Sequence, residues 1–350
     1  MTITKSKNAS GALGGYLSGC RDAVFCHIRR YLGRRTAALP PAMRRCVLDY
    51  PYRRGKALRP ALLMLFSDAF GGPRARALKV AATYQLLEDW GLGRDDLLDG
   101  GLMRRGRPSL HVLYGVPAAV NALDMLHDCV ADMLYSYCAL PAGEYRAAQR
   151  LFAEATEVTL GGQHLDIAAR AIPLGKFTPA AYLNIARRKT AFYTCVAPCL
   201  LGAALAGRRD AFAAIRRFAL PLGAAFQIMD DVLDAENDGR GGFGKAPGND
   251  IREGKRTLLA ALAWRRLPRA EARELADFYS SPAAARTPGR VRRVRRLLLD
   301  SGAAAQCRAK AAALTRAALA AFEKELRPRM RAPYGGLTAD LMRLLLRRTL

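Results

Sequence analysis

Two aspartate clusters with one spacing are the feature that most restricts what this chain can fold into. They are Asp95-Asp96-Leu97-Leu98-Asp99 and Asp230-Asp231-Val232-Leu233-Asp234. Each cluster has carboxylates at positions i, i+1 and i+4, and on a helix positions i and i+4 lie one turn apart on the same face. The spacing therefore predicts two helices, each of which aims at least two carboxylates at one point. A pair of such sites, with cations nearby, suits Mg²⁺ ions and a diphosphate.

The rest of the chain also has the apolar spacing of helices. Ala and Leu dominate, β-branched runs are scarce, and apolar residues recur every three or four positions. The clearest helical segments are Ala61–Phe70, Val80–Leu98, Val116–Leu140 and Arg146–Ala169. Gly and Pro interrupt the pattern at 71–73, 106–108, 140–143 and 172–175. Because no βαβ alternation is present, we expect an all-α fold.

Composition narrows the class of protein. The chain has 350 residues, 51% of them hydrophobic, which is enough for a sizeable core. The formal net charge of +26 invites a nucleic-acid-binding interpretation, but the basic residues are spread along the whole chain. We therefore expect a generally basic surface and no nucleic-acid partner. An anionic substrate or an anionic membrane surface is still favoured electrostatically.

The cysteines and the N-terminal segment indicate a cytoplasmic protein. The eight cysteines include no CxxC pair, which favours buried thiols in a reducing compartment. Residues 1–20 have no apolar run like that of a signal peptide, and no stretch reaches about 18 uninterrupted apolar residues, so no transmembrane helix is expected. We expect a flexible tail over residues 1–15 and a single domain over residues 16–350.

Polar and basic residues follow each aspartate cluster. Arg104 and Arg105 come after the first; Lys245 and Lys255 come after the second, within a Gly-rich segment, 238–255, that indicates an ordered loop or a lid. Guanidinium and ammonium groups suit the phosphate oxygens that a bridging Mg²⁺ leaves over. Upstream, Lys56 and Arg59 could hold a second anion near a helix N-terminus. Polar positions inside apolar helices are by default satisfied core residues. Those here are Gln163, Asp166, Lys189 and Thr190, while Gln227 lies one turn before Asp231 of the second cluster.

Seven motifs in order resemble those of the trans-isoprenyl diphosphate synthases of the polyprenyl synthetase family. They run from about residue 50 to the C-terminus: GKALRP (55–60), DDLLDGGLMRRGRPSLH (95–111), YGVPAAVNALD (114–124), GGQHLD (161–166), KT (189–190), FQIMDDVLD (226–234) and FGKAPGNDIREGKRTLL (243–259). The resemblance implies the isoprenoid synthase fold, a single-domain helical bundle whose central apolar cavity has the two aspartate helices at its mouth. It also implies a homodimer.

The resemblance further implies a reaction and a set of site residues. The enzyme would condense isopentenyl diphosphate with an allylic diphosphate, using Mg²⁺ (three ions in each site, with Mn²⁺ as a substitute). Asp95, Asp99 and Asp230 would be the principal Mg²⁺ ligands, and Asp96, Asp231 and Asp234 would complete the acidic shell. The allylic diphosphate would be held by Arg104, Lys189, Gln227, Lys245 and Lys255, and the isopentenyl diphosphate by Lys56, Arg59 and Arg105. Thr190 with Lys189 and Gln227 would place dipoles near the carbocation, and Gln163 and Asp166 would belong to the substrate site.

Two positions depart from the family pattern. The family usually has His or Gln seven residues before the first aspartate, touching the isopentenyl diphosphate, and this chain has Glu88. A carboxylate repels a diphosphate unless the carboxylate is protonated or paired. The residue before the first aspartate is commonly His, and here it is Arg94, which could pair with Glu88 or Asp89. The hypothesis is that Glu88 weakens or alters the second-substrate site.

Side chains one or two turns before Asp95 are expected to set the product length. A residue five positions back lies roughly 7–8 Å deeper along a helix, and Trp90 occupies that position. Gly91, four back, offers no blockage, and Leu87 lies one turn further. We therefore predict a geranylgeranyl (C20) product, with farnesyl (C15) next, while Trp90 as a core aromatic stays the alternative.

Three other functions remain open at this point. A terpene synthase would ionise the allylic diphosphate without condensation, but it would have little reason to keep Lys56, Arg59 and Arg105. A non-catalytic regulatory subunit would typically lose aspartates, and this chain keeps all six. An Arg-rich nucleic-acid binder would show steep salt-dependent affinity for DNA.

Overall fold

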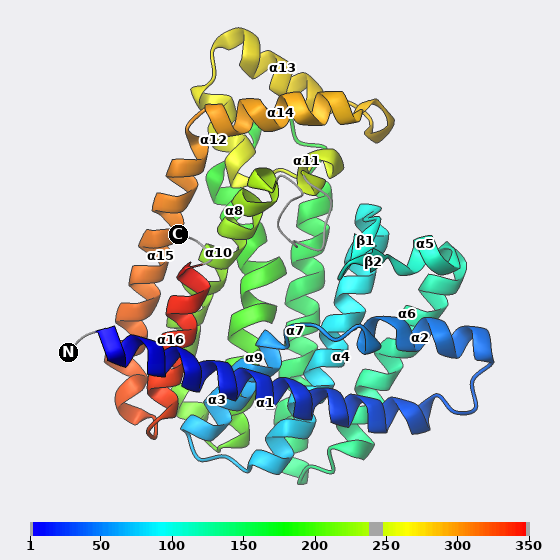
Figure 1. Ribbon diagram of the computed structural model, residues 1–350, viewed down its shortest axis with the longest axis vertical. Helices are drawn as coiled ribbons and strands as arrows, with labels where there is room; N and C mark the ends of the chain where they lie inside the picture. The colour runs from blue at the N-terminus through cyan, green and yellow to red at the C-terminus, as the bar shows by residue number, and fades with distance from the viewer. Residues whose placement is uncertain (1–2, 238–247, 348–350) are drawn as a thin grey trace. The chain divides into compact units, whose positions relative to one another are not determined.

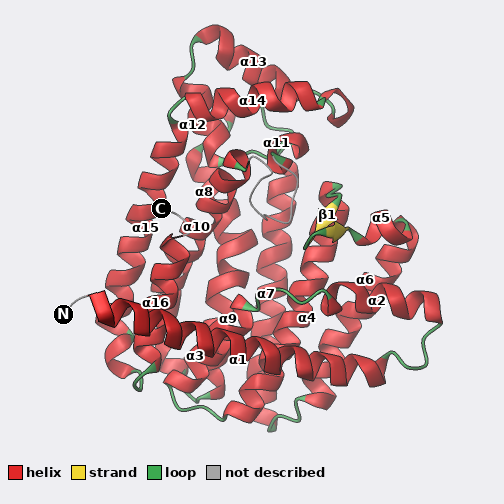
Figure 2. Cartoon of the chain, viewed as in Figure 1, coloured by secondary structure: helices red, strands yellow, loops and turns green. Residues whose placement is uncertain are grey.

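The computed structural model describes residues 3–237 and 248–347, with side chains over 11–237 and 248–344. These residues are almost entirely helical, as Figure 2 shows, and the all-α prediction is confirmed. The chain divides into two compact units. The first contains residues 1–154, 197–215 and 323–341, and the second contains residues 155–196, 216–322 and 342–350. The expectation of a 1–15 tail and one further domain stays a prediction, although helix α1 runs through residue 15 without a break.

The first unit is built around a buried helix, α3. Its helices and strands are α1 (Ile3–Arg35), α2 (Pro41–Tyr52), α3 (Leu58–Ala69), α4 (Arg74–Asp99), β1 (Met103–Arg104), β2 (Arg107–Pro108), α5 (Leu110–Tyr114), α6 (Val116–Asp132), the π-helix η1 (Met133–Tyr137), α9 (Ala197–Leu205) and the short 3₁₀-helices η4 (Arg209–Ala211) and η6 (Arg327–Arg329). Every residue of α3 from Pro60 onward is buried. A helix that is apolar all round must be covered on all sides, and α3 packs against α1, α4 and α9 (Figure 1).

The second unit packs several shorter helices around its own core. They are the 3₁₀-helix η2 (Leu174–Lys176), α8 (Pro179–Ala186), the π-helix η3 (Arg187–Val196), α11 (Asn249–Glu253), α12 (Leu258–Arg266), α13 (Arg269–Ser280), the 3₁₀-helix η5 (Ala283–Ala285) and α14 (Pro288–Asp300). Helix α12 packs against α8, α13 and α14. The core includes Phe177, Tyr182, Ile228, Val232 and Phe278.

Four long helices have residues in both units. They are α7 (Ala142–Ala169), α10 (Phe212–Glu236), α15 (Ala303–Glu325) and α16 (Tyr334–Arg347). The first aspartate cluster ends α4 in the first unit, and the second cluster ends α10 within the second unit. Both clusters are therefore helical, as their spacing predicts.

The helix breaks lie where Gly and Pro predicted them. Helix α3 ends at Ala69 and α4 begins at Arg74, while α7 begins at Ala142. The basic segment 287–296 is helical from its second residue, because the Thr287 hydroxyl caps a helix that begins at Pro288. The side-chain oxygen of Thr287 accepts a hydrogen bond from the Arg290 N–H, which satisfies one of the open donors of the first turn.

A two-residue hairpin follows α4 and was not predicted. Strands β1 and β2 pair antiparallel, with Arg104 opposite Arg107. The two turn residues, Arg105 and Gly106, have φ angles of 53° and 74°. Positive φ at both central residues is the geometry of a type I′ turn, whose twist matches that of the flanking strands. The left-handed backbone at Arg105 is unusual for a residue with a side chain.

Candidate functional site

The first aspartate cluster divides into one buried and two more accessible carboxylates. Asp96 is buried and accepts hydrogen bonds from the Tyr50 hydroxyl (2.5 Å) and from Nε of Arg104 (2.9 Å). Asp95 keeps 24% of its side chain exposed and lies 3.8 Å from the Arg104 guanidinium. Asp99 is half-buried and precedes Gly100, whose φ of 66° ends the helix. Asp95 and Asp99 thus stay on the more accessible side of the helix end.

The hairpin places two neighbouring arginines on different carboxylates of α4. Arg104 binds Asp96, while Nη2 of Arg105 lies 2.8 Å from Oδ1 of the fully buried Asp89. Burial raises the pKa of Asp89 to about 6, although Arg105 opposes that effect. Arg53, the residue after α2, holds the hairpin in place. Its guanidinium donates to the carbonyl oxygens of Arg104 and Pro108, both at 2.7 Å.

Glu88 is paired, but not with Arg94. Its Oε1 lies 2.7 Å from Nη1 of Arg59, and both side chains are largely buried. The Arg94 guanidinium instead lies over the Trp90 ring, 5.3 Å from the ring centroid. The sequence left a pairing of Arg94 with Glu88 or Asp89 open; in the structure the ion pairs of these carboxylates are to Arg59 and Arg105. Arg59 and Arg105, both assigned to the isopentenyl diphosphate, therefore already contact a carboxylate. Lys56, which is assigned to the same substrate, lies in the exposed loop before α3, between Gly55 and the left-handed Ala57 (φ 52°).

The second cluster resembles the first at its first two positions and differs at the third. Asp231 is buried and accepts hydrogen bonds from the Tyr182 hydroxyl and from Nε2 of Gln227, both at 2.6 Å. Burial, together with the nearby Asp250 carboxylate, raises the pKa of Asp231 well above 3.8. Asp234 is also buried and accepts from the Asp250 backbone N–H at 3.0 Å. Asp230 is more accessible than either.

The π-helix η3 sets the positions of Lys189 and Thr190. Nζ of Lys189 lies 2.7 Å from Oδ2 of Asp166 on α7, and the Thr190 hydroxyl donates to Oε1 of Gln227. A Cβ on Gly162 would overlap the Lys189 backbone, so α7 can approach η3 this closely only because residue 162 has no side chain.

The remaining residues predicted for the substrate site are partly described. Nζ of Lys255 lies 2.8 Å from Oε2 of Glu253 and 3.2 Å from Oδ1 of Asp250. Gln163 on α7 is buried. Lys245 lies outside the described residues, as does most of the predicted lid, residues 238–247.

The three residues expected to set product length differ in their surroundings. The Trp90 ring packs on the His127 ring of α6, with the centroids 4.5 Å apart, and Leu87 is buried. A Cβ built on Gly91 meets no atom within 4 Å. The open position on this helix is therefore Gly91, which lies one turn before Asp95 on the same face.

The carboxylates fit a divalent cation that is shared with a substrate. Among the described residues, no three His, Cys, Asp or Glu side chains gather into a complete metal site. Mg²⁺ is commonly held by one or two carboxylates together with substrate phosphates and water, and needs no full protein cage. Asp95 with Asp99 supplies such a pair, since neither is as deeply buried as Asp96.

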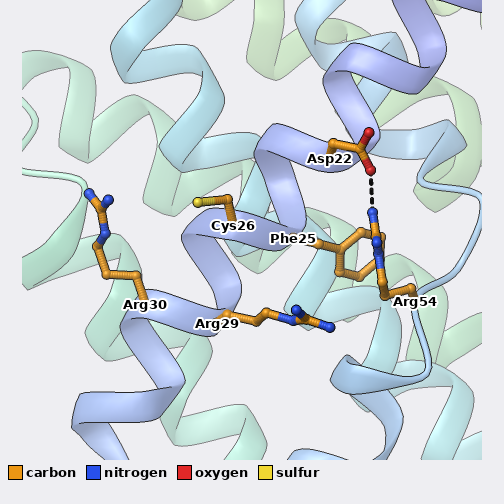
Figure 3. A pocket seen from close by; sticks show the side chains of 6 residues that line it. All are labelled: Asp22, Phe25, Cys26, Arg29, Arg30 and Arg54. Carbon is orange, nitrogen blue, oxygen red and sulfur yellow. Dashed lines mark hydrogen bonds and ion pairs between the residues drawn. The ribbon is translucent and has the colours of Figure 1, made fainter.

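A separate pocket of about 610 Å³ lies in the first unit and contains none of the predicted site residues. Figure 3 shows Arg54 paired with Asp22 and placed over the Phe25 ring. The remaining lining residues lie on α1, as Asp22 and Phe25 do: Cys26, Arg29 and Arg30. Cys26 is exposed, whereas the other seven cysteines are buried.

Sequence reasoning missed the two tyrosines at the clusters. Tyr50 and Tyr182 lie 46 and 49 residues before the aspartates that they contact. No local spacing links them to the clusters. The one available signal was at Tyr182, which stands in a largely apolar helical segment, 179–186.

These features define an almost entirely helical protein that carries two aspartate clusters of the same spacing, the first of which contacts Arg104. The chain belongs to the polyprenyl synthetase family, whose model matches residues 41–297. A geranylgeranyl diphosphate synthase of Saccharolobus solfataricus is 34% identical over 59% of this chain. The match spans only 61% of that relative's own length. A geranylfarnesyl diphosphate synthase of Aeropyrum pernix is 32% identical over 71% of this chain and 77% of its own.

The fold has known counterparts as well. A polyprenyl synthase of Caulobacter crescentus CB15, solved with calcium and isoprenyl diphosphate, is 27% identical with a TM-score of 0.80. The likeness covers 94% of this chain and 95% of that one. The isoprenoid synthase fold expected from the sequence is therefore confirmed. In the part of the chain that the structure describes, no helix has the length and apolar character needed to cross a membrane.

Proposed function

We propose that this chain is a trans-prenyltransferase that condenses isopentenyl diphosphate with an allylic diphosphate to give a short prenyl diphosphate. The family match over residues 41–297 carries the proposal. Relatives named as geranylgeranyl diphosphate synthases make C20 the first expected product, with C15 next. The geranylfarnesyl relative shows that longer products also occur among similar proteins.

The cofactor is proposed to be Mg²⁺. Similar structures were solved with calcium or magnesium and isoprenyl diphosphate, which supports use of a divalent ion. Asp95, Asp99 and Asp230 would be the principal Mg²⁺ ligands, since they are the more accessible aspartates of their own clusters. The ion would neutralise charge on the departing diphosphate. Three ions in each site, with Mn²⁺ as a substitute, stay predictions.

The chain's own residues would support ionisation of the allylic substrate. Arg104, Lys189 and Lys255 carry the positive charge that stabilises a leaving diphosphate. The Thr190 hydroxyl and the Gln227 amide form one hydrogen-bonded chain that ends on Asp231. These hydrogen bonds orient the hydroxyl and amide dipoles that would lie near the allylic carbocation. The isopentenyl double bond then attacks the cation, and a proton is lost, with the released pyrophosphate as its expected acceptor.

Arg59, Arg105 and Lys56 are proposed to hold the isopentenyl diphosphate. Because Glu88 and Asp89 contact two of these cations, the second substrate would have to compete with carboxylates. The partners are thus two anionic prenyl diphosphates. A homodimer and a cytoplasmic location stay predictions.

Product analysis tests the proposal directly. Pure protein is incubated with Mg²⁺, labelled isopentenyl diphosphate and each allylic primer in turn. Incorporation of label into a C15 or C20 diphosphate is expected. Loss of diphosphate without incorporation of label would identify a terpene synthase, and no conversion of any primer would favour a regulatory subunit. Salt-dependent DNA binding in a filter assay would identify a nucleic-acid binder.

A further inference from the structure

The two aspartate clusters share an anchor that their sequence motif does not contain. In each cluster the second aspartate is buried and accepts a short hydrogen bond from a buried tyrosine on a neighbouring helix. Tyr50 of α2 donates to Oδ2 of Asp96, and Tyr182 of α8 donates to Oδ2 of Asp231. The two tyrosines are 1% and 4% exposed, so both bonds are shielded from water.

Each bond compensates a carboxylate that the fold has removed from solvent. A buried carboxylate is costly unless it is hydrogen-bonded or paired. Burial and the neighbouring carboxylate raise the pKa of both tyrosine hydroxyls, so each stays a protonated donor at neutral pH. A second donor completes each anchor: the guanidinium of Arg104 for Asp96 and the amide of Gln227 for Asp231.

The anchor also determines which carboxylates are left for ligands. Adjacent positions on a helix point about 100° apart, so fixing the second aspartate fixes the rotation of the whole turn. With Asp96 held inward, Asp95 and Asp99 stay together on the more accessible side. In the second cluster Asp231 is held inward in the same way, and the adjacent Asp230 stays on the more accessible side of α10.

We propose that Tyr50 and Tyr182 are positioning residues that hold the second aspartate of each cluster as a buried anchor and so aim the accessible aspartates at divalent cations. The inference rests on the proposed function, since it takes the clusters to bind cations together with a diphosphate. Removal of a group that orients a metal ligand typically weakens metal affinity tenfold to a hundredfold.

Three tyrosine variants and one direct binding measurement test this proposal. Tyr50→Phe and Tyr182→Phe delete only the donor, and Tyr31→Phe is the matched control, because its hydroxyl makes the same kind of bond, 2.6 Å to Asp132, away from either cluster. Free Mn²⁺ is followed by electron paramagnetic resonance while each protein is titrated in the presence of inorganic pyrophosphate. The Mg²⁺ concentration for half-maximal condensation is measured alongside.

We expect Tyr50→Phe and Tyr182→Phe to weaken Mn²⁺ binding roughly tenfold or more and to raise the half-saturating Mg²⁺ by a similar factor. Tyr31→Phe should stay within about twofold of the wild type. Equal Mn²⁺ binding by all three variants would overturn the proposal. A wild-type protein that neither binds Mn²⁺ with pyrophosphate nor condenses substrates would instead reject the proposed function itself.

A second pair of variants keeps the test decisive if a tyrosine variant does not fold. Asp96→Asn keeps an acceptor for Tyr50, whereas Asp95→Asn removes a charge proposed to touch the cation. We expect Asp95→Asn to weaken Mn²⁺ binding at least tenfold more than Asp96→Asn. Equal losses would show that Asp96 is a ligand rather than an anchor, and would contradict the inference.

Discussion

Glu88 and Asp89 are neighbours on α4, and each contacts an arginine proposed to bind the second substrate. Glu88 pairs with Arg59 and Asp89 pairs with Arg105, in largely buried surroundings. Breaking one side of a buried pair leaves the other charge uncompensated. An incoming diphosphate can supply the replacement charge, so these residues make substrate binding an exchange of one anion for another.

Glu88→Gln should lower the Michaelis constant for isopentenyl diphosphate, by roughly threefold to tenfold if about 1 kcal/mol of competition is removed. The constant for the allylic substrate should not change. Steady-state kinetics with each substrate varied in turn measures both. Glu144→Gln, which removes the partly exposed pair with Arg76, is the control. An unchanged constant for isopentenyl diphosphate would remove Glu88 from the second-substrate site.

Asp89 predicts a pH dependence of folding. Its folded pKa is raised from 3.8 to about 6, so the folded state binds the proton more tightly than the unfolded state. The resulting stability is fully present below pH 3.8 and is lost as pH rises through about 6. Relative to Asp89→Asn, the wild type should lose on the order of 3 kcal/mol of unfolding free energy across that window. Denaturant unfolding of both proteins at several pH values measures this change. A wild type whose free energy of unfolding stays level or rises relative to that of Asp89→Asn between pH 3.8 and about 6 would contradict it.

The aspartates themselves could be predicted from spacing, but their partners could not. Positions i and i+4 are read from a helix period, whereas Tyr50 and Tyr182 reach the clusters only after separate helices pack. The same limit explains Arg94. It is near Glu88 in sequence, yet it lies over Trp90, while Arg59 of another helix takes the carboxylate.

On helix α4, Gly91 lies one turn before Asp95 on the same face, and a Cβ built on Gly91 would meet open space. Gly91→Phe should shorten the main product by one or more isoprene units, because the new ring would fill the space proposed for the growing prenyl chain. Gly143→Phe, at another open glycine, should leave the product unchanged. Mass spectrometry of the dephosphorylated products measures chain length. The same product from Gly91→Phe and the wild type would reject this face as the limit to growth.

Trp90→Ala gives the contrasting test on the same helix. If the Trp90 ring limits the growing chain, the product should lengthen. An unchanged product would leave the ring as a core aromatic packed on His127.

The contact between α7 and η3 depends on one glycine. Gly162→Ala would force a methyl group into the Lys189 backbone, whereas Gly161→Ala meets nothing within 4 Å. Overpacking of this kind typically costs about 1–3 kcal/mol. We expect Gly162→Ala to lower both the melting temperature and the turnover number, and Gly161→Ala to preserve both. Equal melting temperatures for the two variants would contradict the close packing.

Elements with a strong period were predictable, and those built from irregular backbone were not. The apolar spacing of α3, α4 and α7 and the Gly-Pro breaks between them are local signals. The packing of the π-helix η3 depends on its close approach to α7, and the β1–β2 hairpin depends on a left-handed backbone at Arg105. The spacing of apolar residues in the sequence indicates neither feature.

At the scale of the whole molecule, many arginines serve the fold rather than a partner. The buried Arg256 donates to the carbonyl oxygens of Arg170, Ile172 and Gly254, and Arg295 donates to those of Ala235 and Glu236. The guanidinium groups of Arg256 and Arg295 therefore have a structural role within the second unit.

The apolar surface of α5 and α6 supports the predicted homodimer. Val116 and Val120 lie one turn apart on α6 and are 53% and 41% exposed, and Val112 and Leu113 of α5 are similarly exposed. Contiguous exposed apolar residues mark interfaces. A Val116→Glu, Val120→Glu double variant should be monomeric in light scattering, while Leu344→Glu, at another exposed apolar side chain, should not alter the molar mass. A dimer that survives the double variant would place the interface elsewhere.

The hairpin after α4 joins Asp89 and Asp96, which lie about 10 Å apart along the helix axis. One peptide bond joins the two arginines whose guanidinium groups contact them, and the left-handed backbone at Arg105 costs on the order of 1 kcal/mol to maintain. The short turn thus ties the backbone position of Arg104 to that of Arg105. A displacement of the hairpin backbone would therefore shift both arginines at once, and with them the contacts to Asp89 and Asp96.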